Sequence, residues 1–157
     1  ICKDGQVKFL ASVPAALEEV SATNNSVSAV LDTKTGDVAA QALIKSFKFK
    51  VPLMEEHFNE NYLESDKFPK ATFKGKILNF DASKITATKT NVTVEGDFTM
   101  HGVTKHIKIP ATISKVGNKI NVASNFTIKA QDYNIKIPSL VKQKVAEDIK
   151  VWVNFNF

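Results

Sequence analysis

Apolar and polar residues alternate along most of this chain, and no other feature constrains its fold as strongly. The clearest run closes the sequence, where single residues separate five apolar side chains: Ile149, Val151, Val153, Phe155 and Phe157. Further alternating runs cover residues 7–13, 73–77, 92–100 and 120–129. Because successive side chains of a β-strand point to opposite faces, this period of two predicts strands with one dry and one wet face.

Turn signals rich in glycine separate these runs. They lie at residues 33–36, between strands expected at 27–31 and 38–51, at residues 101–102, after the 92–100 run, and at residues 117–118, between strands expected at 107–114 and 119–129. About eight strands result, without an internal repeat or a domain boundary, so we expect one all-β domain over residues 1–157. Such strands form a closed barrel or a sandwich, and the alternation alone leaves both open.

Two segments break the alternation. Residues 14–25 form a connection that contains about one helical turn. The second segment, residues 52–65, is predicted to be a short helix, because Pro52 suits a first helical turn and acidic residues follow it. Met54, Phe58 and Tyr62 are four residues apart and form one apolar stripe. Such a stripe needs an apolar surface to cover, which favours a barrel whose mouth carries a helical lid.

The composition is that of an ordinary globular domain, and it excludes some partners. The 157 residues include 43% hydrophobic and 24% charged residues, with a net charge of +5. All 21 basic residues are lysine, and arginine supplies most bidentate contacts to phosphate and guanine, so we expect no nucleic-acid partner. The lysines are dispersed, as on a solvated outer face. The alternative is transient contact with an anionic membrane surface.

The single cysteine, Cys2, excludes an internal disulfide, and we expect a frayed terminal thiol. The chain starts at Ile1 instead of Met, which is expected after removal of a secretory signal and equally after trimming for expression.

Three motifs carry a resemblance to a known family. They are HFNENYLESDKFPKATFKG in the helix–proline–strand segment, VEGDFTMHGVTKHI from Val94, and QDYNIKIPSLVKQKVAEDIKVWVNF from Gln131 to Phe155. In this order they resemble the YceI-like, polyisoprenoid-binding family of bacterial barrels. The resemblance implies an eight-stranded antiparallel, lipocalin-like barrel whose long apolar lumen holds an isoprenoid or another amphiphilic chain. It also implies export, to the periplasm or beyond the cell. The usual Arg-Asp pair of the helix region is Glu55-Glu56-His57 here, which leaves the lipid's identity open.

Two groups of residues are candidates for ligand binding. The lumen group would point inward from several strands and consists of Phe9, Phe73, Ile77, Phe98, Met100, Phe126, Ile128, Val153 and Phe155. An eight-stranded barrel is just wide enough to be filled by side chains or to hold one ligand, so a solid core is the alternative. Small inward residues, such as Gly75, Gly96 and Ser124, favour a cavity. The lid group would close the mouth and consists of Met54, His57, Phe58, Tyr62, Leu63 and Tyr133. A permanent plug would have the same sequence pattern.

Metal binding and catalysis find little support. His57 and Glu60 are three residues apart, and His101 and His106 flank a turn, but zinc needs three or four convergent ligands. Glu56 and Glu60 lie one helical turn apart and would face solvent, and no nucleophile motif occurs.

We therefore expect a non-enzymatic protein without a metal or a cofactor, other than a bound lipid. It would sequester or carry an isoprenoid, quinone or fatty-acyl lipid, with the head group near Glu56, His57 and Tyr62. The alternatives are a structural or interaction barrel with a filled core and a metal-assisted hydrolase. The oligomeric state stays open, including a dimer through Phe155 and Phe157.

Overall fold

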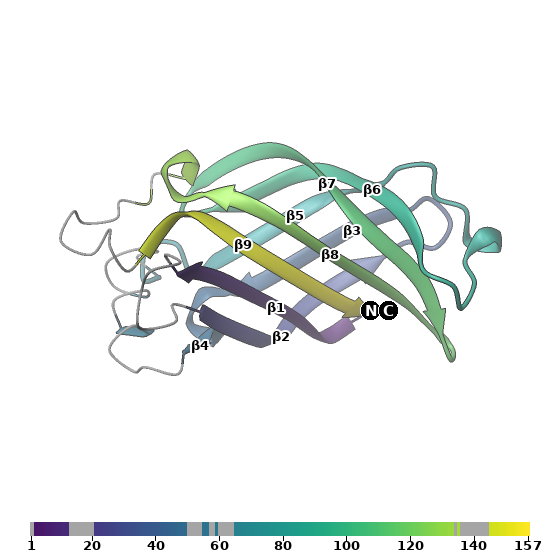
Figure 1. Cartoon of the computed structure of the whole chain (residues 1–157), viewed down its shortest axis with the longest axis horizontal. Coiled ribbons are helices and arrows are strands. Elements are labelled where there is room, and N and C mark those ends of the chain that lie inside the picture. The colour runs from purple at the N-terminus through teal and green to yellow at the C-terminus, as the bar shows by residue number, and fades with distance from the viewer. Residues whose placement is uncertain are drawn as a thin grey trace.

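In the computed structural model of the chain, eight long antiparallel strands close into a barrel (Figure 1). The structure describes residues 2–12, 21–49, 55, 56, 59, 65–133, 135 and 145–157. Its strands are β1 (Cys2–Ser12), β2 (Ser21–Leu31), β3 (Asp37–Leu43), β4 (Lys48–Phe49), β5 (Lys70–Ile77), β6 (Thr90–Met100), β7 (Val103–Val116), β8 (Lys119–Lys129) and β9 (Val145–Asn156). Neighbours follow the order β1-β9-β8-β7-β6-β5-β3-β2, and pairing of β1 with β2 closes the ring. This confirms the expected lipocalin-like barrel and excludes the sandwich.

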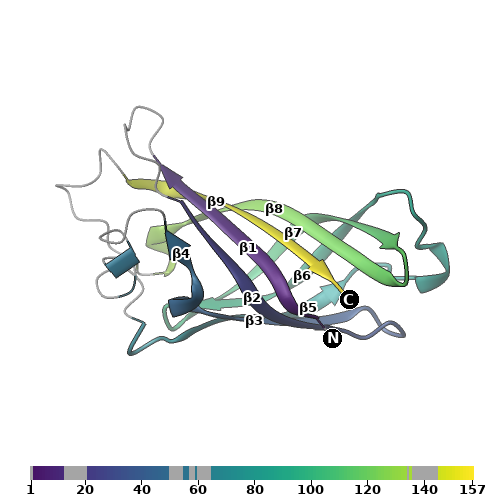
Figure 2. The ribbon, with the colours of Figure 1, turned by 90° about the horizontal axis from the view of Figure 1, so that it is seen from below.

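Short 3₁₀ turns complete the described structure. They are η1 (Ile44–Ser46), η3 (Ala82–Lys84) and η4 (Ala130–Tyr133). Turns η1 and η4 lie at one end of the barrel, which we call the η4 end, and the β2–β3 and β7–β8 turns lie at the other (Figures 1 and 2). Within the described residues, no helix is long and apolar enough to cross a bilayer.

The long strand predicted at residues 38–51 is interrupted. Strand β3 ends at Leu43, η1 follows, and the two-residue β4 pairs with β2 at Ala22 and Thr23. The turn allows both Ile44 and Phe47 to be buried, which the strict alternation of a straight strand would not. The amide N–H of Ile44 donates to the Pro69 carbonyl at 2.9 Å and fixes the turn.

The connection expected at residues 14–25 is shorter than predicted, because Ser21 already belongs to β2. Residues 24–26 form an irregularity in the β1–β2 register. Fully buried Asn24 stabilises it, since its side chain donates to the Leu43 carbonyl at 3.1 Å and accepts from the Ser26 amide at 2.9 Å. This pairing satisfies a buried amide and lets Val27 point inward on the same strand.

Strands β5 and β6 approach each other closely at two glycines. Gly75 and Gly96 are direct partners in the register. A Cβ atom added at Gly96 would collide with the Gly75 Cα and the Lys74 carbonyl oxygen. The lack of a side chain at both positions therefore allows the two backbones to approach closely. The expectation that these glycines leave open volume in the lumen is wrong.

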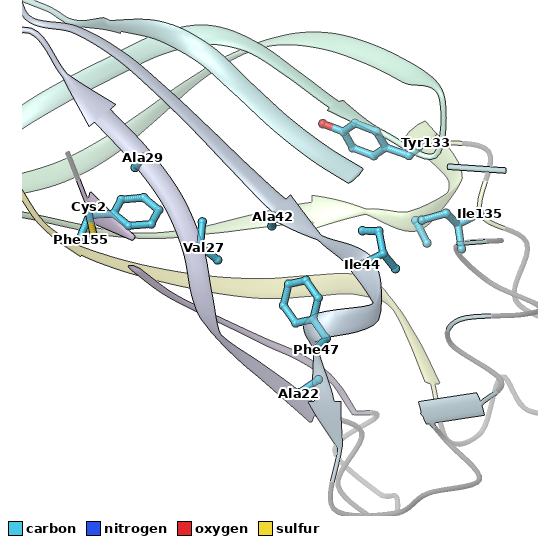
Figure 3. Packing of buried hydrophobic residues seen from close by; sticks show 11 residues of the cluster. Cys2, Ala22, Val27, Ala29, Ala42, Ile44, Phe47, Tyr133, Ile135 and Phe155 are labelled. Atoms are coloured by element: carbon cyan, nitrogen blue, oxygen red, sulfur yellow. The ribbon is translucent and has the colours of Figure 1, made fainter. Parts of the chain in front are cut away.

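The barrel interior contains two packed clusters. One lies at the end opposite η4 and consists of Leu31, Ile77, Val94, Ala111, Ile113 and Val122. The other extends toward the η4 end and includes Val27, Ala42, Ile44, Phe47 and Phe155 (Figure 3). Cys2 belongs to this second cluster with only 2% of its surface exposed. The predicted frayed thiol is wrong, because β1 pairs with β2 up to the Cys2–Ala29 partners.

Candidate functional site

The candidate site is an apolar cavity of about 180 Å³ inside the barrel. Side chains from β1, β2, β3 and β5 to β9 line it, and η1 adds Ile44. Gln41, Thr72 and Ser124 are its polar lining residues, and none of the residues that line it is charged. An apolar cavity of this kind offers a polar solute few hydrogen-bond partners. It binds hydrocarbon through the hydrophobic effect.

All nine residues predicted to face the lumen line this cavity. Phe98 and Phe126 come from β6 and β8, while Val153 and Phe155 come from β9. Period two alone places them inward, because successive side chains of a strand point to opposite faces. Their role in binding a ligand stays a prediction.

A second group of cavity-lining residues has short side chains and was not predicted from the sequence. Ala40 and Ala42 on β3 and Ala71 on β5 form a stretch of wall with short side chains. Ala40 pairs with Phe73, and Ala42 pairs with Ala71. Alanine occurs on wet and dry faces alike, so these residues gave little signal. The available clue was the period of two, which places Ala40 and Ala42 on the same face of β3 as Val38.

The barrel wall has an unpaired stretch between β7 and β8. The ladder between these strands covers only residues 112–116 and 119–123, whereas β7 remains paired with β6 over residues 103–113. We call the facing stretches 103–111 of β7 and 124–129 of β8 the β7–β8 seam. Half-buried side chains from both sides of the seam, including Ile109 and Phe126, line the cavity.

Pro110 explains where the ladder ends. Its carbonyl accepts a hydrogen bond from the Ser124 hydroxyl, so the backbone of Pro110 faces β8 at this point. Proline has no amide hydrogen to donate to the neighbouring strand. The regular ladder therefore ends at Thr112 and does not extend to Pro110. Beyond this point the seam forms the wall of the lumen.

Comparison with known proteins assigns the fold to a family. A family model described as the YceI-like domain matches residues 3–157. The chain belongs to the YceI-like family. Among curated proteins, a UPF0312 protein of Pseudomonas putida (strain GB-1) is 33% identical over 97 residues, which span 58% of this chain and 47% of that protein. The match thus spans about half the length of this relative.

Solved structures of other bacterial proteins share the fold. A polyisoprenoid binding domain from Saccharophagus degradans, implicated in plant cell wall breakdown, aligns with a TM-score of 0.82 and 16% identity, over 99% of this chain and 94% of its own. BcnA of Burkholderia cenocepacia aligns with a TM-score of 0.79 and 16% identity, over 98% and 96%. At these identities the likeness shows the fold alone.

Most of the predicted lid of this YceI-like chain lies outside the described residues. Met54, His57, Phe58, Tyr62 and Leu63 all belong to that part of the sequence. Within the described part, Glu55 and Glu56 are helical. The Glu55 carboxylate accepts a hydrogen bond from the Phe49 amide at 3.2 Å. This contact ties the start of the segment to β4.

Tyr133, the remaining residue predicted for the lid, is buried on η4. Its ring packs against Phe98 with centroids 5.4 Å apart. Burial raises the pKa of Tyr133, and the nearby Asp132 carboxylate adds to the effect. The His101 ring Nδ1 lies 2.9 Å from the Tyr133 carbonyl oxygen and donates to it. Tyr133 thus packs against Phe98 and does not itself line the cavity.

A charged cluster lies on the outer face of β6 and β7. His106 bridges two carboxylates, with Nε2 3.0 Å from Glu95 and Nδ1 2.9 Å from Asp97. Lys108 lies 3.6 Å from the other oxygen of Glu95. His106 is therefore part of an ion-pair cluster on neighbouring strands. Within the described residues, histidine, cysteine and acidic side chains form no group suited to a metal ion.

The cluster predicts a pH-dependent contribution to stability. The hydrogen bonds to Glu95 and then Asp97 raise the pKa of His106 above 6.5, and the bond from His106 lowers the pKa of Glu95 below 4.5. The histidine's contribution is complete below pH 6.5 and is lost as pH rises through the raised pKa. The contribution of Glu95 is complete above pH 4.5 and is lost as pH falls through the lowered pKa.

We expect the NMR titration of His106 to have its midpoint above 6.5. In Glu95→Gln the midpoint should fall, because the first acceptor is lost. Asp132→Asn, which removes a distant carboxylate, should leave it unchanged. A midpoint that is the same in wild type and Glu95→Gln would contradict the bridge.

Proposed function

We propose that this YceI-like domain binds the hydrocarbon chain of an amphiphilic lipid in its lumen and sequesters or carries it. The observation that carries the proposal is the apolar cavity inside a closed barrel, lined by side chains from eight strands and by no charged group. A hydrophobic ligand gains about 0.8 kcal/mol for each methylene removed from water. About ten buried methylenes would therefore contribute about 8 kcal/mol, which offsets the cost of association without a strong polar contact.

The family supports this class of ligand. The Saccharophagus degradans relative is described as a polyisoprenoid binding domain. We extend the hydrophobic ligand to this chain and keep isoprenoid, quinone and fatty-acyl lipids as candidates. We also propose that the domain is a binding protein without catalysis, because the cavity lining offers no titratable side chain to act as a nucleophile or a general base.

Native mass spectrometry of the purified protein tests the proposal. We expect one added mass that disappears on denaturation, and solvent extraction should then yield a lipid of that mass. If the protein is bare, it should take up an isoprenoid quinone or a fatty acid at one-to-one stoichiometry. A protein that stays bare after incubation with both would contradict lipid binding and favour a structural or interaction barrel.

A further inference from the structure

One lysine of β7 breaks the apolar pattern on the lumen side of the wall. The lumen-facing positions of β7 between Val103 and Ile113 hold valine, isoleucine or alanine, except at Lys105. Lys105 pairs directly with Phe98 of β6. Directly opposite residues of an antiparallel pair point to the same side of the sheet. Because Phe98 lines the cavity, the Lys105 side chain leaves the backbone on the lumen side.

Lys105 lies on the β7–β8 seam, where, among the described residues, β7 has a hydrogen-bonded strand on one side only. Although it starts on the lumen side, its side chain is exposed. Long basic side chains lay their methylenes along apolar surface and keep the ammonium group in water. Here the hydrocarbon part of Lys105 begins beside Phe98, and the seam provides the boundary between lumen and solvent.

The charge of Lys105 is not neutralised by the described part of the protein. Lys108 of the same strand pairs with Glu95, and Lys45 pairs with Asp66. No carboxylate of the described residues forms an ion pair with Lys105. A cation at the edge of an apolar cavity attracts an anion, and burying that anion deeper in the uncharged lumen would cost several kcal/mol.

We propose that Lys105 binds the anionic head group, a carboxylate or a phosphate, of an amphiphile whose hydrocarbon chain lies in the lumen. The head group lies in the seam, and the chain extends from it past Phe98 and Ile107. This inference rests on the proposed function and adds the chemical class of the head group. It assigns the head group to Lys105, whereas we had expected the head group near Glu56, whose carboxylate would repel an anion.

Three ligands with one chain and different head groups test the inference: oleate, oleyl phosphate and oleyl alcohol. Their affinities at pH 8 follow from displacement of the neutral fluorescent probe N-phenyl-1-naphthylamine. We expect wild type to bind at least one anionic ligand about tenfold more tightly than the alcohol, as for one charge-assisted contact at a partly exposed site. The stronger of the two anions identifies the head group as carboxylate or phosphate.

Variants of Lys105 decide whether this lysine is responsible. Lys105→Gln should lose the preference for the anion and keep the affinity for oleyl alcohol, and Lys105→Arg should retain the preference. Lys8→Gln is the matched control, because it removes the same charge from an exposed outward position on β1. An anion preference that survives in Lys105→Gln, or is absent from wild type, would overturn the inference and leave lipid binding intact. A wild type that binds none of the three ligands would also overturn the inference, and it would overturn the proposed function if the protein takes up no isoprenoid quinone either.

Discussion

Replacing Ala40 with phenylalanine should weaken lipid binding by about fiftyfold. Ala40 lines the cavity from β3, and a phenyl ring at this position would take up much of a space of about 180 Å³. If the ring displaces about three methylenes of the ligand, the loss is about 2.4 kcal/mol, which corresponds to this change in affinity. Native mass spectrometry of the loaded protein and displacement of a neutral fluorescent probe both measure the effect.

The neighbouring residue offers a matched control. Ala39 is the preceding residue of β3 and is exposed on the outer face, so Ala39→Phe makes the same chemical change outside the lumen. It should leave the affinity unchanged. Overpacking can destabilise Ala40→Phe by about 1–3 kcal/mol, and circular dichroism has to show that the variant is folded. A folded Ala40→Phe protein with a full lipid load would contradict binding in the lumen.

Replacing Gly96 with alanine should destabilise the fold by about 3 kcal/mol, which is large for the addition of one methyl group. The new Cβ would collide with the Gly75 Cα and the Lys74 carbonyl oxygen, both of which belong to the backbone of β5. A backbone collision cannot be relieved by a side-chain rotation, so β5 and β6 have to move apart. Urea unfolding monitored by circular dichroism measures the loss.

Gly117 separates this steric effect from the ordinary cost of losing a glycine. It has φ of +60°, and nothing lies within 4 Å of a Cβ added there. Gly117→Ala should therefore cost only about 1 kcal/mol, from the left-handed backbone conformation. Gly96 is absent from the positive-φ residues, so its cost arises from the neighbouring strand. If Gly96→Ala proves no more destabilising than Gly117→Ala, the close contact of β5 and β6 is not tight in solution.

The inward set of side chains was predictable from the sequence, whereas the register was not. Phe98, Phe126 and Val153 could be assigned to the lumen because side-chain direction repeats every two residues within one strand. The opposition of Gly75 and Gly96 could not be predicted, because it depends on how two strands align with each other. The same holds for Asn24, whose burial follows from a local shift between β1 and β2.

Sequence alone thus determined the all-β class, the residues that face the interior and the apolar character of that interior. These properties depend on alternation within a strand, which is a local consequence of backbone geometry. Only the tertiary structure decided that β3 ends at Leu43, that Cys2 is buried and that Lys105 lies on an open seam. Each of these depends on which residues of another strand lie opposite, and pairing between distant segments leaves no local trace in the sequence except at residues such as Pro110, which cannot donate to a neighbour.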